Sequence, residues 1–115
     1  MLVQSKAVIA AAKKAGIKHI VHLGVFNPKS DCYDAHFAWH QTIEAYAKGS
    51  GIQYALLRPN CFMQNFNGFY SLGKNGKVRF YVNDVKMGWT ALEDVGEAAA
   101  KILSEEPLKQ RAKDY

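Results

Sequence analysis

The sequence predicts an α/β fold built on a small parallel sheet, and three observations support this prediction. Two short strand-like segments, 17–24 and 52–59, lie on either side of a segment with helical spacing. The second of them, IQYALLRP, is apolar at consecutive positions, which is typical of a parallel strand covered on both faces. Further helical patterns precede and follow this unit. Strand, helix and strand then form a βαβ unit, whose crossover should be right-handed.

The elements follow from the residues in chain order. The stretch 3–15 is rich in Ala and Lys at helical spacing, and Gly16 stands where a left-handed residue would end that helix. A strand is expected over 17–24, followed by a loop over 25–33 in which Asp31, or Asp34 just beyond it, can cap the next helix. That helix should run to about Lys48, where the sequence GSG stops it.

After the second strand the pattern predicts smaller elements. Residues 62–72 are expected to form a helix, GKNGK a turn, and VRFYV, residues 78–82, an extra edge strand. The residues 87–90 are expected to be extended. Glu93 or Asp94 should open a last helix that Pro107 ends. Without repeats or a linker, the chain is expected to form one domain over residues 1–115.

Composition excludes several classes of protein. The chain is 49% hydrophobic and 22% charged, as an average globular domain is, and no apolar run approaches the ~18 residues that span a bilayer. Cys32 and Cys61 have neither CxxC spacing nor enough partners for a disulfide framework. The net charge of +5 is spread along the chain without a nucleic-acid-binding motif. We therefore expect a cytoplasmic protein that binds neither membrane nor nucleic acid.

The candidate site lies where the two main strands end. In an open parallel sheet, ligands bind beyond the carboxyl ends of the strands, so the residues that leave them should be neighbours in space. These residues are Gly24, Val25 and Phe26 after the first strand, and Pro59, Asn60, Cys61 and Phe62 after the second. Pro59 cannot donate to a sheet, and Asn60 can offer both donors and acceptors to a ligand. The alternative is a plain turn, with Arg58 extended into solvent.

At this point the sequence resembles a known family. The stretches AAKKAGIKHIVHLG, HQTIEAYAKGSGIQYALLRPNCFMQN and WTALEDVGEAAAKIL together look like the NmrA-like family of atypical short-chain dehydrogenase/reductases, with the same order and spacing. The resemblance implies a partial Rossmann-like three-layer fold that binds NAD(P). It implies that the parallel βαβ sheet carries an extra edge strand and a C-terminal helix. The residues after the two strands then form the nicotinamide and substrate side of the cofactor site. The cofactor-binding candidates are Gly24, Val25, Phe26, Pro59, Asn60 and Phe62.

The resemblance also assigns catalytic positions. In better-known relatives a Ser ends the first of these strands, and a Tyr and a Lys lie four residues apart on the next helix. Here Gly24 stands at the Ser position, with His40 and Glu44 at the Tyr and Lys positions. His40 and Glu44 are therefore the catalytic candidates, as an acid/base pair. Because several family members sense the dinucleotide without turnover, the resemblance together with this departure implies that the chain lacks independent catalysis.

The cofactor motif itself is missing from this sequence. A Rossmann fingerprint needs a Gly-rich turn between a strand and a helix to hold the pyrophosphate, and the chain has no GxGxxG or GxxGxxG. The chain therefore resembles the middle of a longer protein, a single truncated domain in which NAD(P) binding is expected to be weak or absent. Any activity would be an NAD(P)H-dependent oxidoreduction completed by missing segments or a partner.

Two further interpretations concern partners. Without its usual neighbouring strand, the apolar stretch from His19 to Leu23 is an open edge, so we expect a homodimer that covers it. The alternative function is accordingly a non-catalytic, self-associating α/β module or a small-molecule-binding one. His36, His40 and Glu44 form one helix stripe at spacing i, i+4, i+8, but three residues along one helix cannot surround an ion, so no metal site is expected.

Overall fold

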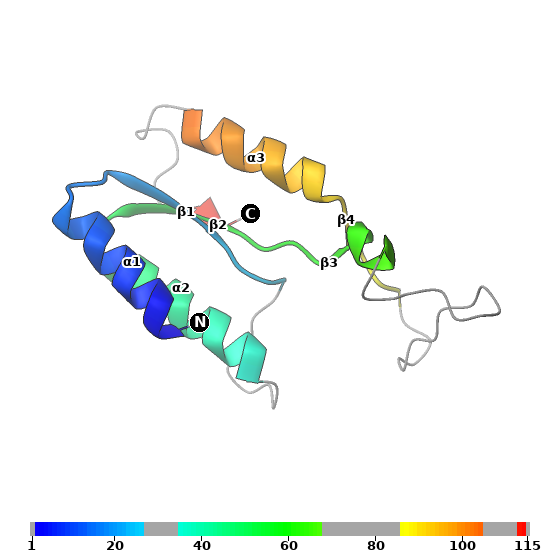
Figure 1. Ribbon diagram of the computed structural model, residues 1–115, viewed down its shortest axis with the longest axis horizontal. Coiled ribbons are helices and arrows are strands. Elements are labelled where there is room, and N and C mark those ends of the chain that lie inside the picture. Colours follow the sequence, from blue (N-terminus) through cyan, green and yellow to red (C-terminus); the bar gives the residue numbers. More distant parts are fainter. Residues whose placement is uncertain (1, 27–34, 68–85, 105–112, 115) are drawn as a thin grey trace.

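The computed structural model describes residues 2–26, 35–67, 86–104 and 113–114 of the chain. A three-stranded parallel sheet has the order β1-β2-β5, with β1 at His19–Leu23, β2 at Gln53–Leu57 and β5 at Lys113–Asp114. Helices α1 (Leu2–Lys14) and α2 (Ala35–Gly49) cover one face of the sheet, and α3 (Leu92–Ser104) covers the other (Figure 1). The predicted three-layer α/β fold with a parallel βαβ unit is confirmed.

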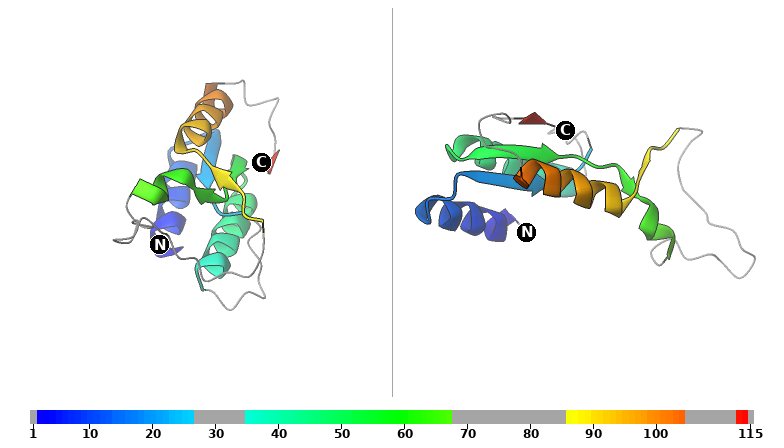
Figure 2. Two further views of the ribbon diagram at one scale, coloured as in Figure 1. Left: turned by 90° about the vertical axis from the view of Figure 1, so that its right-hand side faces the viewer. Right: turned by 90° about the horizontal axis from the view of Figure 1, so that it is seen from above.

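Two apolar clusters explain why β2 is apolar at consecutive positions. On one face, Ile9 of α1 and Ile43 of α2 pack with Ala47, Ile52 and the half-buried Ile20 of β1. On the other face, Ala55 and Leu57 pack against Ile102 and its neighbours on α3, while Leu56 between them is 0% exposed. Side chains of β2 alternate between the two layers, so Ala55, Leu56 and Leu57 are buried against helices, while Gln53 and Tyr54 at the start of the strand are half-buried. The two layers are visible on opposite sides of the sheet in Figure 2.

The helix ends follow the local chemistry that the sequence predicts. Gly16 has φ 72°, and the Ile17 N–H donates to the Ala12 carbonyl at 3.0 Å, which closes α1 with a left-handed residue. Gly51, with φ 81°, turns the chain after α2 into β2. Near the same turn Ser50 is buried, and its hydroxyl donates to the Ala47 carbonyl at 2.7 Å.

Beyond β2 the chain differs from the sequence prediction. Cys61–Phe62 forms a short strand, β3, which pairs in parallel with β4 at Trp89–Thr90, and Met63–Asn67 is a 3₁₀ helix rather than the predicted α-helix. The α-helix prediction was therefore wrong for 62–67. Phe66 packs on another segment of the chain, since the rings of Phe66 and Trp89 lie 4.6 Å apart. The extended segment expected at 87–90 is confirmed at β4.

The last helix begins at Leu92, with Glu93 and Asp94 in its first turn as expected. The side chain of Gln64 reaches this helix start from the 3₁₀ segment: its oxygen accepts from the Leu92 N–H at 3.1 Å, and its amide donates to Glu93 at 2.6 Å. A distant side chain thus satisfies a backbone donor that a helix start leaves open. This contact also fixes α3 against the segment that follows β2.

Several expectations lie outside the described residues: the loop with Asp31 and Asp34, Cys32, the turn GKNGK, the strand at 78–82 and the stop at Pro107. The structure also describes an edge strand that the sequence analysis missed, β5. Its residues pair with Ala55 and Leu56 on the far side of β2 from β1. In the described part of the chain, no helix is long and apolar enough to span a bilayer.

Candidate functional site

The residues that leave β1 and β2 lie side by side. The Gly24 N–H donates to the Leu57 carbonyl at 2.8 Å, and the Phe26 N–H donates to the Pro59 carbonyl at 2.9 Å. Pro59 cannot donate to this pairing, but its carbonyl continues it by one step. The expectation that these two strand ends are neighbours is confirmed. They form a paired shelf beyond the sheet, from which the half-buried Val25 and the 59% exposed Phe26 project.

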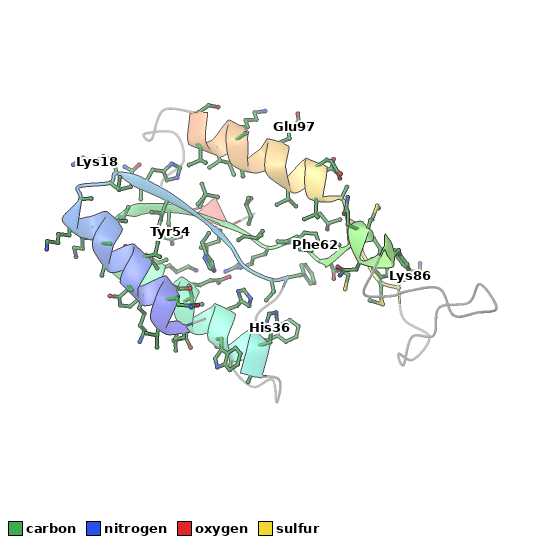
Figure 3. The ribbon with its side chains drawn as sticks, in the orientation of Figure 1. Lys18, His36, Tyr54, Phe62, Lys86 and Glu97 are labelled. Atoms are coloured by element: carbon green, nitrogen blue, oxygen red, sulfur yellow. The ribbon has the colours of Figure 1, made fainter. Side chains whose placement is uncertain are left out.

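Asn60 and Phe62 follow these residues along the chain, and part of the Asn60 amide is used in a hydrogen bond within the protein. The side-chain oxygen of Asn60 accepts from the Cys61 N–H at 3.0 Å, which sets the turn into β3. Its amide nitrogen packs so close to Gly88 that a Cβ there would lie 3.0 Å away. Phe62 is half-buried and stands opposite Thr90 in the short sheet (Figure 3). Their predicted role toward a cofactor remains a prediction.

A shallow cleft of about 220 Å³ opens on the α3 side of this shelf. Its wall is formed by Arg58, Pro59 and Thr90 together with the first turns of α3. Most of its surface is apolar, with the Asp94 side chain among the lining residues. A cleft that is apolar with a few polar groups is the usual form of a small-molecule site.

The two catalytic candidates face the sheet from α2. His40 is 8% exposed and Glu44 is 4% exposed, so both are buried. They are one helical turn apart and share a face. The stripe is therefore not a solvated surface at these two residues, whereas His36, one turn earlier, is exposed (Figure 3).

The sequence analysis did not foresee the partner of Glu44. Arg58 binds both carboxylate oxygens, with its Nε 3.0 Å from Oε1 and its Nη2 2.6 Å from Oε2. This is the two-pronged geometry in which guanidinium and carboxylate bind most strongly. Arg58 thus does not extend freely into solvent, and the Glu44 carboxylate is held by an ion pair rather than by His40.

His22 of β1 is the second group that the sequence analysis missed. Its ring lies 6.1 Å from that of His40, whose ring lies 4.7 Å from that of His36. His22 Nε2 and His40 Nδ1 are buried without a hydrogen-bond partner in the described structure. The alternation along β1 was the available signal, because it places His22 on the same face as Ile20, toward α1 and α2.

Burial controls the charge of these histidines. Burial lowers the pKa of His22 from its ordinary value of 6.5, and the Glu44 carboxylate opposes this. Burial also lowers the pKa of His40, the neighbouring His36 and His22 lower it further, and Glu44 again raises it. Both rings are therefore mainly neutral at neutral pH, when an imidazole can both donate and accept a proton.

The arrangement is not one that binds a metal. Among the described residues, no group of three or more His, Cys, Asp or Glu side chains could hold a metal ion. The His36 and His40 rings meet edge to face at 80°, and the His22 ring is tilted by 46° from that of His40. Cys61 is a half-buried free thiol in β3.

Comparison with known proteins agrees with this arrangement of elements. The chain matches the NmrA-like family over residues 1–114, and it belongs to that family. Prestalk A differentiation protein A of Dictyostelium discoideum is 30% identical over 105 residues, which cover 90% of this chain and 33% of that protein. The chain thus spans about a third of the length of that relative.

A solved structure shows the same fold. The crystal structure of the Citrobacter sp. triphenylmethane reductase complexed with NADP(H) superposes with a TM-score of 0.82 at 24% identity, over 99% of this chain and 40% of the reductase chain. The Rossmann-like architecture predicted from the sequence is confirmed.

Proposed function

We propose that the paired strand ends form the nicotinamide side of an NAD(P) site, in a protein related to NAD(P)H-dependent reductases or redox sensors. One observation carries this proposal: hydrogen bonds join Gly24 to Leu57 and Phe26 to Pro59. They place a backbone shelf at the carboxyl edge of a parallel sheet, which is where such folds bind their ligands. The family membership and the NADP(H) bound by the Citrobacter reductase support the choice of ligand.

The proposal gives each candidate residue a role. Val25 and Phe26 offer apolar contact to a nicotinamide ring, and the cleft beside Pro59 offers room for a small substrate. His40 is the candidate for proton exchange, since it is buried near the strand ends and mainly neutral. Glu44, held by an ion pair, serves better as a structural partner of this site than as the base.

We further propose that this chain alone binds NAD(P) weakly and lacks independent catalysis. The sequence offers no Gly-rich turn for the pyrophosphate, and pyrophosphate contacts supply much of the affinity of such sites. An oxidoreductase activity would then need residues beyond these 115 or a partner. The proposed location is the cytoplasm, because the two cysteines do not form a disulfide framework.

The test separates the two halves of the cofactor. Reduced nicotinamide mononucleotide, AMP and NADPH are each titrated into the isotopically labelled chain, and backbone amide resonances are followed by NMR. We expect the nicotinamide mononucleotide to shift the amides of Gly24, Phe26 and Cys61, and AMP to leave them unchanged. Equal shifts with AMP, or no shift with either nicotinamide compound, would refute the assignment. Saturation at micromolar NADPH would refute the claim that this chain binds weakly.

A second candidate function, self-association, has an observation of its own. In the part of the chain that the structure describes, β1 pairs only with β2, so its outer edge carries open backbone groups. A groove of about 340 Å³ lies beside this edge, and Val8 in its wall is 68% exposed. We propose that a second copy pairs along His19–Leu23. Native mass spectrometry tests this, and a soluble monomer at all concentrations would refute it.

A further inference from the structure

His22 of β1 and Gly24, the residue that follows β1, face two residues of α2 in register. His22 and Gly24 are two apart on a strand, or about 6.6 Å, and His40 and Glu44 are four apart on a helix, or about 6 Å. The matching repeat sets the His22 ring 6.1 Å from the His40 ring and places Gly24 against the Glu44 carboxylate. Strand and helix are therefore in contact at two successive levels just below the proposed site.

The contact at Gly24 leaves no room for a side chain. A Cβ on Gly24 would lie 2.9 Å from Glu44 Oε1, which is closer than real Cβ atoms come to a neighbour. The backbone of Gly24 does not require glycine, because the positive φ values found in the described residues belong to Gly16 and Gly51. Space, taken up by the carboxylate, is the reason for glycine at this position.

The carboxylate cannot easily give way. Both of its oxygens bind Arg58, at 3.0 and 2.6 Å, and Glu44 is 4% exposed. A shift that made room at position 24 would break a partly buried, two-pronged ion pair. Gly24, Glu44 and Arg58 thus form one unit that joins the end of β1, helix α2 and the end of β2.

We propose that Glu44 and Arg58 are positioning residues for His40, and that this ion pair takes the space of a side chain at position 24. The pair holds α2 at a fixed distance from both strand ends, so His40 keeps its place beside His22 and below the shelf. A hydroxyl side chain at position 24 and the ion pair exclude each other. Proton exchange with a bound substrate therefore falls to His40, a step that rests on the proposed function.

A double-mutant cycle tests the shared space. Gly24→Ala should lower the folding equilibrium constant about tenfold in the natural sequence, and much less in a chain that also carries Glu44→Ala. Gly96→Ala is the matched control, because a Cβ there meets nothing within 4 Å and helix α3 favours alanine. An equal loss from Gly24→Ala with and without Glu44 would overturn the proposal.

An NMR titration of His40 measures its pKa, which would not change if Glu44 and Arg58 served packing alone. Glu44→Gln keeps the shape but removes the negative charge that raises the pKa of His40, so His40 should titrate at lower pH. Arg58→Lys keeps the positive charge and should leave a titration nearer to that of the natural chain than Arg58→Met does. If His40 titrates in Glu44→Gln as it does in the natural chain, the positioning role is overturned. This test does not depend on whether the Gly24→Ala variant folds.

These measurements need no cofactor, so they fail independently of the proposed function. If reduced nicotinamide mononucleotide does not bind, the NAD(P) assignment falls, while the cycle and the titration still decide the role of the ion pair. If it binds, Glu44→Gln and Arg58→Met should weaken its binding severalfold, whereas Gly96→Ala should not. Equal binding by all four chains would refute a positioning role at this site.

Discussion

Removing Arg58 should be far more damaging than its half-exposed position suggests. Its side chain is 23% exposed, but its partner carboxylate is 5% exposed and accepts two hydrogen bonds from it. Arg58→Met would keep most of the packing and leave Glu44 as a buried, unpaired charge. Losing one partner of a fully buried pair costs ~3–5 kcal/mol, and partial exposure of this pair lowers our expectation to about 2–4 kcal/mol.

Urea unfolding followed by tryptophan fluorescence and circular dichroism measures this loss. A loss of ~3 kcal/mol corresponds to a thermal midpoint roughly 10 °C lower in a chain of this size. Glu44→Gln should cost less, since the remaining guanidinium can reach water. The combined variant Glu44→Gln/Arg58→Met should recover much of the loss, because no charge then stays buried. If Arg58→Met costs under ~0.5 kcal/mol, or if the two losses simply add, the pair does not carry the energy inferred from its geometry.

Three further predictions concern pH, a helix start and a helix end. Burial lowers the pKa of both His22 and His40, so at acidic pH the unfolded chain binds more protons than the folded one, and the free energy of unfolding should fall as pH drops below about 6.5. His40→Gln should make this fall shallower in urea titrations between pH 5 and 8. A pH dependence as steep as that of the natural chain would contradict the prediction. Gln64→Ala removes the side chain that caps α3 and should lower the free energy of unfolding by about 1 kcal/mol, measured by thermal unfolding. An unchanged free energy of unfolding would contradict this prediction. Gly16→Ala should cost about 1 kcal/mol because Gly16 is left-handed, whereas Gly49→Ala, with open space around it and no positive φ, should be neutral or stabilising; similar effects at both would refute the argument from φ.

Local patterns predicted the elements that local chemistry controls. The ends of α1 and α2 follow from glycines that take left-handed φ, and β2 follows from its unbroken apolar run between two helical layers. The meeting of the two strand ends followed from topology alone, since parallel strands bring their carboxyl ends to one edge. These inferences need only neighbours in sequence or the direction of strands.

The features that the sequence did not predict depend on contacts between residues far apart in the chain. The partner of Glu44 is 14 residues away, β5 pairs with a strand almost 60 residues earlier, and Phe66 packs on Trp89 rather than along a helix. A glutamate among apolar residues of an amphipathic helix was a signal of a buried partner, but the sequence offered several cations. Only the packing of α2 against the end of β2 selects Arg58, and that packing is a tertiary contact that local sequence patterns do not give.

The ion pair also bears on why a glycine stands at position 24 of this chain. A buried ion pair is weak evidence for stability, because well-packed apolar residues of similar volume often stabilise a fold equally well or better. What Glu44 and Arg58 supply that apolar residues would not is a fixed charge beside His40, together with a joint between α2 and both strand ends. Both effects act on the proposed site, and neither Glu44 nor Arg58 belongs to the two apolar clusters of the core. We therefore infer that Gly24 and the ion pair act together to hold His40 in position, while the Glu44 charge opposes the lowering of the His40 pKa by burial.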